Sequence, residues 1–292
     1  MPFRTLLFTP GNHPRKVAKV FEAGADAIIL DLEDAVAIAE KPATRAAVVA
    51  ALKARPSQRR PRGYVRVNAL STPFAYGDFQ AVVGSWLDGI ILPKVESPAE
   101  LATAQWLLTQ CEREAALPEG SIDLIPIIET AKAEQALGAI ADAATRVKRL
   151  AFGAGDYTLD IGRDWSLDES ELLPIRHQMV SVSRAAGLEP PIDTVFIHLQ
   201  EGEAFSASCA TARSLGFQGK LCIHPGQVMA ANTAFTPSPA QVSYAKKIVA
   251  AFDEAEAAGS ASIQVDGYFV DYPIVEKARR TLALMAAIDA AV

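Results

Sequence analysis

Two carboxylates follow two of the most apolar segments of the chain. Glu129 comes directly after the run LIPII (124–128), and Asp156 follows AFGAG (151–155). A charge is costly to bury without a partner, so an acid at the end of a buried segment indicates a ligand or a counter-charge there. Carboxylate oxygens suit Mg²⁺, which takes one or two of them and completes its shell with water and substrate oxygens. The alternative is that each acid caps the next helix or pairs with a basic neighbour.

Two basic residues occupy similar positions. Arg66 lies inside the apolar run YVRVN, and Lys94 ends the run GIILPK. An arginine in an apolar strand needs anions, and its planar fork suits a carboxylate or an enolate oxygen. An internal salt bridge with Glu33 or Asp34 is the alternative, and both can hold, because those acids could orient the arginine. We expect Glu33, Asp34 and Lys94 to surround the site as supporting residues. A desolvated Lys94 could form a Schiff base, but acids on both neighbouring runs favour a charged lysine.

Eight short apolar runs alternate with longer amphipathic stretches. Each run has about four to six apolar residues with little alternation, which is typical of strands buried on both faces under helices. The runs are 5–8, 27–33, 64–68, 89–94, 123–129, 149–156, 193–199 and 220–225.

Eight units of this kind in about 225 residues predict an α/β fold, the (β/α)₈ TIM barrel. A doubly wound open sheet would show the same alternation, but no GxGxxG turn is present to favour it. The active site of a barrel lies at the carboxyl ends of its strands. Glu129, Asp156, Arg66 and Lys94 all fall there.

The chain changes character after residue 226. It continues as a capped helix with Ser238 as the expected N-cap, then a hairpin or loop, then a last helix, at 235–259, 262–273 and 274–287. We therefore predict a barrel over residues 1–226 and a C-terminal helical appendage over 227–292, too small to fold as an independent domain.

Composition limits the kind of partner. The 292 residues are half hydrophobic and carry a formal net charge of -6, which argues against a nucleic-acid-binding face. Three cysteines, an odd number without metal-ligand spacing, indicate a reducing compartment. The N-terminus lacks the apolar stretch of a signal peptide, and no segment approaches the ~20 apolar residues of a membrane helix. We expect a soluble, cytoplasmic protein.

Nine motifs together resemble one known family. They run in order through nearly the whole chain: LLFTPGNHPRK, ILDLEDAV, VRVN, LPKVES, IPIIET, FGAGDYTLDIG, GFQGKLCIHPGQV, FTPSP and GYFVDYP. This set is similar to the HpcH/HpaI aldolase and citrate lyase β-subunit-like family, which includes malyl-CoA and citramalyl-CoA lyases. The stretch TPFAYGDF (72–79) is more similar to malyl-CoA lyases than to the rest of the family.

The resemblance implies a Mg²⁺-dependent, CitE-like lyase. Such an enzyme cleaves or forms a carbon–carbon bond in a 3-hydroxyacyl-CoA, and the products of cleavage are a 2-oxo acid and acetyl-CoA. Glu129 and Asp156 match the family's metal ligands, with Glu129 also facing the substrate. Arg66 matches the arginine that binds the substrate and its enolate.

The resemblance also implies a coenzyme A site and an oligomer. Phe8 and Lys19 fall near the first turn, which binds CoA in the family. Asp271 of the FVDYP motif matches an acid that acts on the acetyl group and that a neighbouring subunit contributes. A homotrimer or a dimer of trimers follows from that arrangement, with the appendage packing on another subunit.

Three other functions remain open. A citrate lyase β subunit would act on a citryl thioester of an acyl carrier protein. An aldolase would use free pyruvate and an aldehyde. A non-catalytic barrel would bind acyl-CoA as a sensor.

Overall fold

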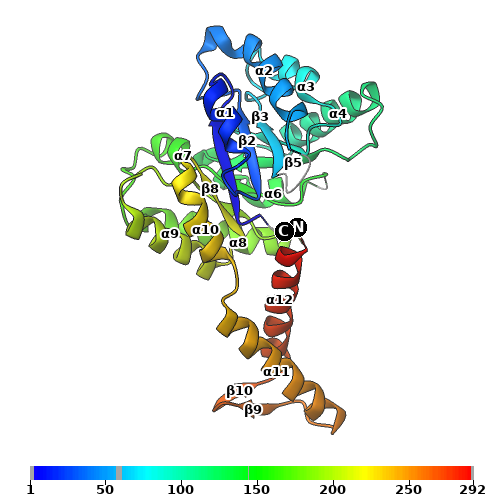
Figure 1. Cartoon of the computed structure of the whole chain (residues 1–292), viewed down its shortest axis with the longest axis vertical. Coiled ribbons are helices and arrows are strands. Elements are labelled where there is room, and N and C mark those ends of the chain that lie inside the picture. The colour runs from blue at the N-terminus through cyan, green and yellow to red at the C-terminus, as the bar shows by residue number, and fades with distance from the viewer. Residues whose placement is uncertain (1–2, 57–60, 144, 291–292) are drawn as a thin grey trace. The chain divides into compact units, whose positions relative to one another are not determined.

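A closed barrel of eight parallel strands forms the larger part of the protein (Figure 1). The computed structural model describes residues 3–56, 61–143 and 145–290. The strands pair in chain order, and β8 closes the ring by pairing with β1. Their bounds are β1 Thr5–Pro10, β2 Ala27–Asp31, β3 Arg62–Arg66, β4 Gly89–Leu92, β5 Asp123–Ile128, β6 Ala151–Phe152, β7 Ile192–Asp193 and β8 Gly219–Cys222. The barrel prediction is confirmed, and the open-sheet alternative is wrong.

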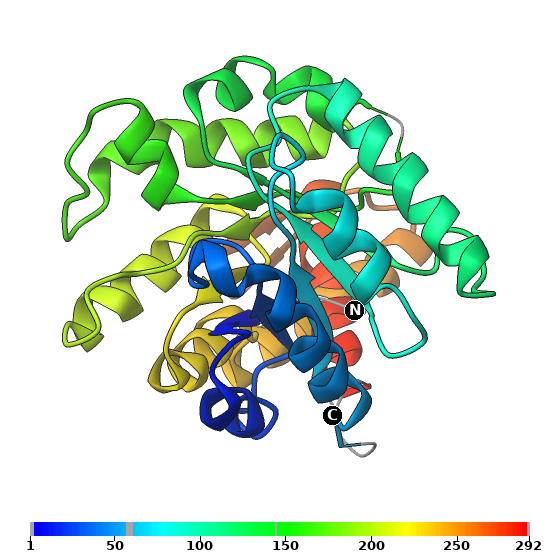
Figure 2. The ribbon, with the colours of Figure 1, turned by 90° about the horizontal axis from the view of Figure 1, so that it is seen from above.

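Helices surround the ring of strands, as the view from above shows (Figure 2). Their bounds are α1 Pro14–Val20, α2 Lys41–Lys53, α3 Ala75–Val82, α4 Pro98–Glu114, α5 Ala131–Gln135, α6 Leu137–Ala141, α7 Ala154–Asp160, α8 Leu173–Ala185, α9 Gly202–Leu215 and α10 Pro225–Phe235, with the 3₁₀ helices η1 Ile38–Glu40 and η2 Ser170–Leu172. Proline occupies the first turn of several of them, where its missing N–H costs no hydrogen bond. Ser97 and Thr130 cap α4 and α5 with their side chains.

Buried aliphatic and aromatic side chains fill the barrel. The cluster comprises Phe3, Leu6, Ala27, Ile29, Tyr64, Ile91, Ile125, Ile127, Ala151, Ile192 and Leu221. Every strand contributes to it. Residues between the members of the cluster, such as Ile28 and Leu30, are buried as well, which explains why the runs are apolar with little alternation. Phe8 packs on this cluster from one side and is only partly buried.

Two strands are shorter than the apolar runs that predicted them. The run 149–156 forms only the two residues of β6, because Gly153 is the N-cap of helix α7 and Asp156 lies in the first turn of that helix. The run 193–199 leaves the barrel after Asp193, where the Thr194 side chain accepts a hydrogen bond from the N–H of Ala154.

The structure divides into two compact units, Phe3–Thr233 and a smaller one from Ala234 onward. The smaller unit contains α11 Pro239–Ala257, the hairpin of β9 Ile263–Val265 and β10 Tyr268–Val270, and α12 Tyr272–Asp289. It has a small apolar core of its own: Ala245, Ile248, Phe252, Val265, Val270, Val275 and Ala278. Ser238 caps α11 in a capping box with Gln241, as predicted.

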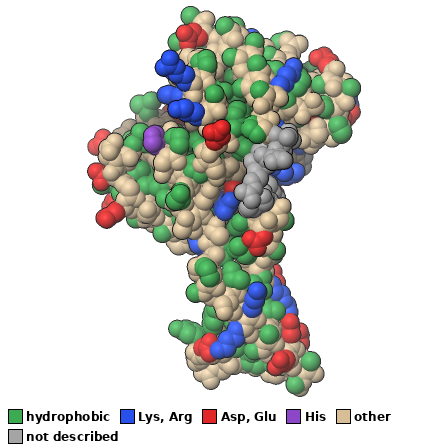
Figure 3. Space-filling model, viewed as in Figure 1, with side chains coloured by type: hydrophobic (Ala, Val, Ile, Leu, Met, Phe, Trp, Pro, Cys, Tyr) green, Lys and Arg blue, Asp and Glu red, His purple; other side chains and the backbone are tan. Residues whose placement is uncertain are grey.

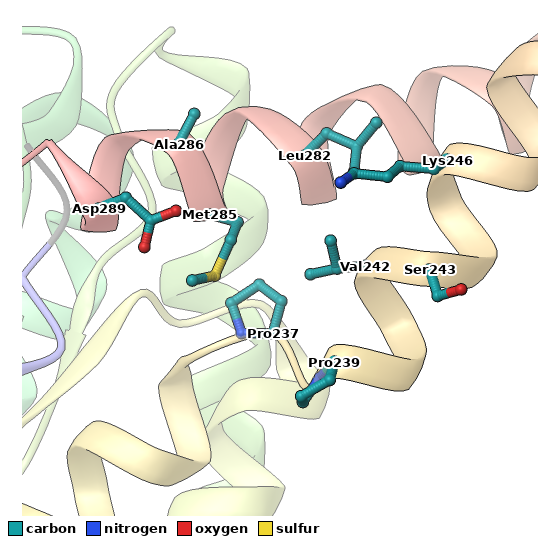
Figure 4. A pocket seen from close by; sticks show the side chains of 9 residues that line it. All are labelled: Pro237, Pro239, Val242, Ser243, Lys246, Leu282, Met285, Ala286 and Asp289. Carbon is teal, nitrogen blue, oxygen red and sulfur yellow. The ribbon is translucent and has the colours of Figure 1, made fainter.

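A pocket of the smaller unit lies between the start of α11 and the last turns of α12 (Figure 4). Pro237, Val242, Leu282 and Met285 line its apolar part. None of the residues expected to do chemistry lies in it. No helix within the described ranges is long and apolar enough to cross a membrane.

Candidate active site

Glu129 lies directly after β5 and is almost fully buried, with 3% of its surface exposed. Its Oε1 accepts a hydrogen bond of 2.7 Å from the backbone N–H of Lys94. The side chain passes so close to Gly153 that a Cβ there would lie 2.5 Å from Oε2. The sequence FGAGD therefore provides a glycine where this carboxylate needs room.

Asp156 belongs to the first turn of α7, and about a third of its side chain (32%) is exposed. A carboxylate at this position is favoured by the helix dipole. Its Oδ1 lies 3.4 Å from the Lys94 ammonium, so Lys94 contacts both acids, one through its backbone and one through its side chain.

Nearby positive charge does not fully offset the burial of two carboxylates at this rim, Glu129 and Glu33. Burial, with the nearby charges of Asp156 and Glu33, raises the pKa of Glu129 to about 8. Burial also raises the pKa of Glu33 to about 7, against the opposing effect of Arg66. A carboxylate in such surroundings is stabilised when a cation binds beside it.

Arg66 is held by a buried carboxylate that the sequence analysis did not assign to the site. Asp31 accepts two hydrogen bonds of 2.7 Å, from Nε and Nη2 of the guanidinium. The expected partner Glu33 lies 3.0 Å from Nη1, and Asp34 lies 3.7 Å away. Asp31 ends the apolar run of β2, but only the strand register, in which it pairs directly with Arg66, distinguishes it from Glu33 and Asp34. Although burial raises the pKa of Asp31, Arg66 outweighs it and holds that pKa below its usual value.

Phe8 supports the same arginine. The Arg66 guanidinium lies over the Phe8 ring, 5.0 Å from its centroid, at a distance favourable for a cation–π contact. Phe8 thus lies at the mouth of the barrel beside Arg66.

Lys94 follows β4 with an unusual backbone. Its φ is 53°, a left-handed conformation that non-glycine residues rarely adopt. Its Nζ lies 3.5 Å from Glu33 and 3.9 Å from Asp34. Burial lowers the pKa of Lys94, but Glu33, Asp34 and Asp156 raise it by more. A lysine held in its charged form is a poor nucleophile, which disfavours the Schiff-base alternative.

A buried lysine fixes the backbone that carries Glu33. Lys41 Nζ donates to the carbonyl oxygens of Leu32 and Glu33 and to the side chain of Asn68. Lys41 comes from helix α2, and no apolar run pointed to it.

The donor set fits a hard divalent cation. Two carboxylates of different exposure, Glu129 and Asp156, reach the same lysine, and oxygen ligands of this kind suit Mg²⁺. Across the residues that the structure describes, no group of three or more His, Cys, Asp or Glu side chains gathers as a complete protein cage. Mg²⁺ needs only one or two protein carboxylates, because water and substrate oxygens fill its other positions.

The two remaining expected residues belong to other elements, α1 and the start of α12. Lys19 is on the exposed face of α1. Asp271 belongs to the smaller unit, where its side chain accepts a hydrogen bond from the N–H of Ile274 and caps α12. The roles of both residues stay predictions.

Comparison with known proteins gives one family. The HpcH/HpaI aldolase/citrate lyase family matches residues 4–225. The chain is 37% identical to the citrate lyase subunit beta of Leuconostoc mesenteroides subsp. cremoris, over 96% of this chain and 92% of that protein. It is 35% identical to a (3S)-malyl-CoA thioesterase of Cereibacter sphaeroides, over 99% and 96% of the two chains.

A solved structure shares the fold over almost the whole chain. The CitE protein of Mycobacterium tuberculosis, in complex with magnesium, acetoacetate and coenzyme A, superposes with a TM-score of 0.78 at 27% identity. The match covers 98% of each chain.

Proposed function

Because the chain belongs to the HpcH/HpaI aldolase/citrate lyase family, we propose that it is a Mg²⁺-dependent carbon–carbon lyase. Its substrate is a 3-hydroxyacyl-CoA such as malyl-CoA or citramalyl-CoA, which it cleaves to a 2-oxo acid and acetyl-CoA or forms from them. The observation that carries this proposal is the meeting of Glu129, Asp156 and Arg66 at the carboxyl ends of β5, β6 and β3.

Glu129 and Asp156 hold the cation. When bound, Mg²⁺ supplies Lewis-acid polarisation of the oxygen on the reacting carbon. The buried Glu129 side chain is held in place, because its Oε1 accepts a hydrogen bond from the N–H of Lys94 and Gly153 leaves room for its Oε2. Asp156 is more exposed and faces solvent and substrate. The relative from M. tuberculosis binds magnesium together with coenzyme A, which supports this assignment.

Arg66 stabilises the enolate oxygen of the acetyl group that leaves. A well-placed donor of this kind contributes about 3 kcal/mol to transition-state stabilisation. Asp31 and Glu33 hold the guanidinium from one side and Phe8 from another, so little rearrangement is needed when charge develops.

Asp271 moves the proton at the acetyl carbon. It acts as general acid in cleavage and as general base in condensation, and it reaches the site of a neighbouring subunit in a homotrimer or a dimer of trimers. Exposed aromatic side chains beside it in the smaller unit support a subunit contact: Tyr268, Phe269 and Tyr272, 68%, 67% and 52% exposed.

The barrel exposes apolar side chains that suit such a partner. They follow β7 and β8, at the rim where the strands end: Ile197, Leu199, Ile223 and Met229. Burial of these side chains against the aromatic end of another copy's smaller unit would bring that copy's Asp271 to the mouth of this barrel.

Coenzyme A binds beside α1. Lys and Arg side chains gather on the face over α1 (Figure 3), and its exposed basic residues are Arg15, Lys16 and Lys19. Ammonium and guanidinium groups suit the phosphates of CoA. Phe8 lies in β1, the strand that leads into α1.

All three cysteines are buried and free, which fits the proposed cytoplasmic location.

The direct test is an assay of the purified protein with Mg²⁺ and a panel of thioesters, followed by mass spectrometry. We expect cleavage of malyl-CoA or citramalyl-CoA that stops on chelation of the metal. Glu129→Gln should lower kcat/KM by roughly a hundredfold or more, because it removes a charged ligand. The matched control is Glu119→Gln, a surface acid 55% exposed, which should keep full activity. Unchanged turnover in Glu129→Gln would remove the metal assignment.

A second candidate is a citrate lyase β subunit that acts on a citryl thioester of an acyl carrier protein. The identity of 37% to the Leuconostoc protein favours it. Such a subunit would leave CoA thioesters intact when it is assayed alone, and would cleave the citryl thioester once citryl-loaded carrier protein is supplied.

A further inference from the structure

Lys94 is held in a conformation that costs free energy. A lysine at φ 53° is strained by roughly 1 kcal/mol or more relative to the right-handed region. Strain of this kind persists where surrounding contacts fix it, and it gathers at functional sites. Here the left-handed backbone aims the N–H at Glu129 Oε1, and the side chain turns to a different set of acids.

The charges at this rim are unbalanced. Five carboxylates, those of Asp31, Glu33, Asp34, Glu129 and Asp156, meet two cations, Arg66 and Lys94. Arg66 is engaged by Asp31 and Glu33. Lys94 is therefore the cation that neutralises Asp156.

The Lys94 ammonium lies at a partly exposed edge of this arrangement. The ammonium is 3.4 Å from Asp156 Oδ1, and the Lys94 side chain is 37% exposed, so this lysine is partly buried. A divalent cation that binds between Glu129 and Asp156 draws on the same Asp156 carboxylate and is repelled by the same ammonium.

We propose that Lys94 is a positioning residue that competes with the divalent cation for Asp156. In the substrate-free protein the ammonium weakens metal binding and keeps Asp156 in place. An anionic substrate then relieves the repulsion, because its carboxylate offsets the positive charge, so metal and substrate bind together more tightly than either binds alone. This inference rests on the proposed metal site of Glu129 and Asp156.

The test is the affinity of the substrate-free protein for Mn²⁺, measured from the electron paramagnetic resonance signal of the free ion. Lys94→Met keeps most of the length of the side chain and removes its charge. We expect Mn²⁺ to bind roughly tenfold more tightly, because a like charge within a few ångström is lost. Lys94→Gln should change the affinity in the same direction and guards against a folding defect in one variant.

Lys132→Met is the matched control. Lys132 also follows a strand end and pairs with an acid, Glu96, but its side chain is 71% exposed. Lys132→Met removes the same charge at a position distant from the proposed ligands, so the Mn²⁺ affinity of this variant should equal that of the unchanged protein. Equal or weaker Mn²⁺ binding in both Lys94 variants overturns the proposal, as does an equal gain in Lys132→Met.

A second readout separates this inference from the metal assignment. With 2-oxo acid present, the gain in Mn²⁺ affinity should shrink in Lys94→Met, since the substrate already supplies the offsetting charge. Mn²⁺ binding that is lost in Glu129→Gln but unaltered in the Lys94 variants defeats only the role of Lys94. Mn²⁺ binding that survives Glu129→Gln defeats the metal site and this inference together.

Discussion

Gly153 gives the buried Glu129 its room. A Cβ at residue 153 would lie 2.5 Å from Glu129 Oε2 and 2.8 Å from its Cβ, which is closer than real contacts allow. The carboxylate would have to turn, and a small misplacement of a ligand costs much activity.

We expect Gly153→Ala to lower kcat/KM by about a hundredfold while the protein stays folded. Gly138→Ala is the control, because the space around Gly138 is open and alanine favours its helix. Steady-state kinetics with Mg²⁺ and far-ultraviolet circular dichroism make the comparison. Equal kinetics of the two variants would show that Glu129 needs no such room.

Asp31 orients Arg66 through two hydrogen bonds, so Asp31→Asn should leave the arginine misdirected. We expect kcat to fall by roughly ten- to a hundredfold, since supporting residues of active-site groups contribute on this scale. Asp34→Asn is the control: Asp34 lies 3.7 Å from Arg66 and its side chain is 53% exposed. A similar loss in both variants would assign the effect to charge alone.

The sequence predicted which residues lie at the rim better than it predicted their partners. Glu129, Asp156, Arg66 and Lys94 follow from the ends of apolar runs. Which acid holds Arg66 depends on the register of β2 against β3, and a strand end gives no register. The left-handed backbone of Lys94 could not be predicted from the sequence either, because lysine has no preference for that conformation.

A buried charge network joins the second half of the barrel to its helices. Asp193 of β7 accepts hydrogen bonds from Arg176 of α8 and Lys220 of β8. Arg176 also donates to Glu169, which in turn accepts from Ser208 of α9. Asp193 therefore joins β7, α8 and β8, and Glu169 connects α9 to the same network.

Asp193→Asn should lower the free energy of unfolding by about 3–5 kcal/mol at pH 7, because it leaves Lys220 buried without its counter-charge and leaves Arg176 with Glu169 alone. Asp253→Asn, at a surface pair whose side chains are about half exposed, should change it by less than about 1 kcal/mol. Urea denaturation of both variants measures the difference. A loss below that of Asp253→Asn would show that the network adds no stability.

The effect of Asp193→Asn should depend on pH. Burial raises the pKa of Asp193, but Lys220 and Arg176 lower it by more, so its folded-state pKa lies below the ordinary value of 3.8. The stability from its charge is thus fully present above that value and is lost as pH falls through the folded-state pKa. The gap between the unchanged protein and the variant should narrow below about pH 4. A gap that stays constant to pH 3 would contradict this account.

The apolar runs predicted most of the barrel strands. The strands β1 to β5 and β8 lie within or beside their apolar runs. The two-residue strands β6 and β7 were overestimated, because glycine and threonine end the ladder early and the following apolar residues continue into a helix or a loop. Helix α10 carries no regular polar face and was not predicted.

The whole molecule has two units whose chemistry is proposed to meet between subunits. Apolar periodicity reveals each unit, but the sequence of one chain does not fix which surface another copy covers.

Complementation tests that shared site. Glu129→Gln and Asp271→Asn chains, co-expressed and purified with two different tags, should each be inactive alone. In a mixed trimer about one third of the sites combine an intact barrel with an intact Asp271, so we expect that share of activity to return. Inactive mixed oligomers would mean that Asp271 does not act across subunits.

The most direct test of the metal assignment is a crystal structure with Mn²⁺ and a 2-oxo acid, with anomalous scattering used to locate the metal. We predict one peak within about 2.0–2.3 Å of an oxygen of both Glu129 and Asp156, with the oxo acid completing the shell. A peak bound elsewhere, with those two carboxylates pointing apart, would contradict the proposed lyase site.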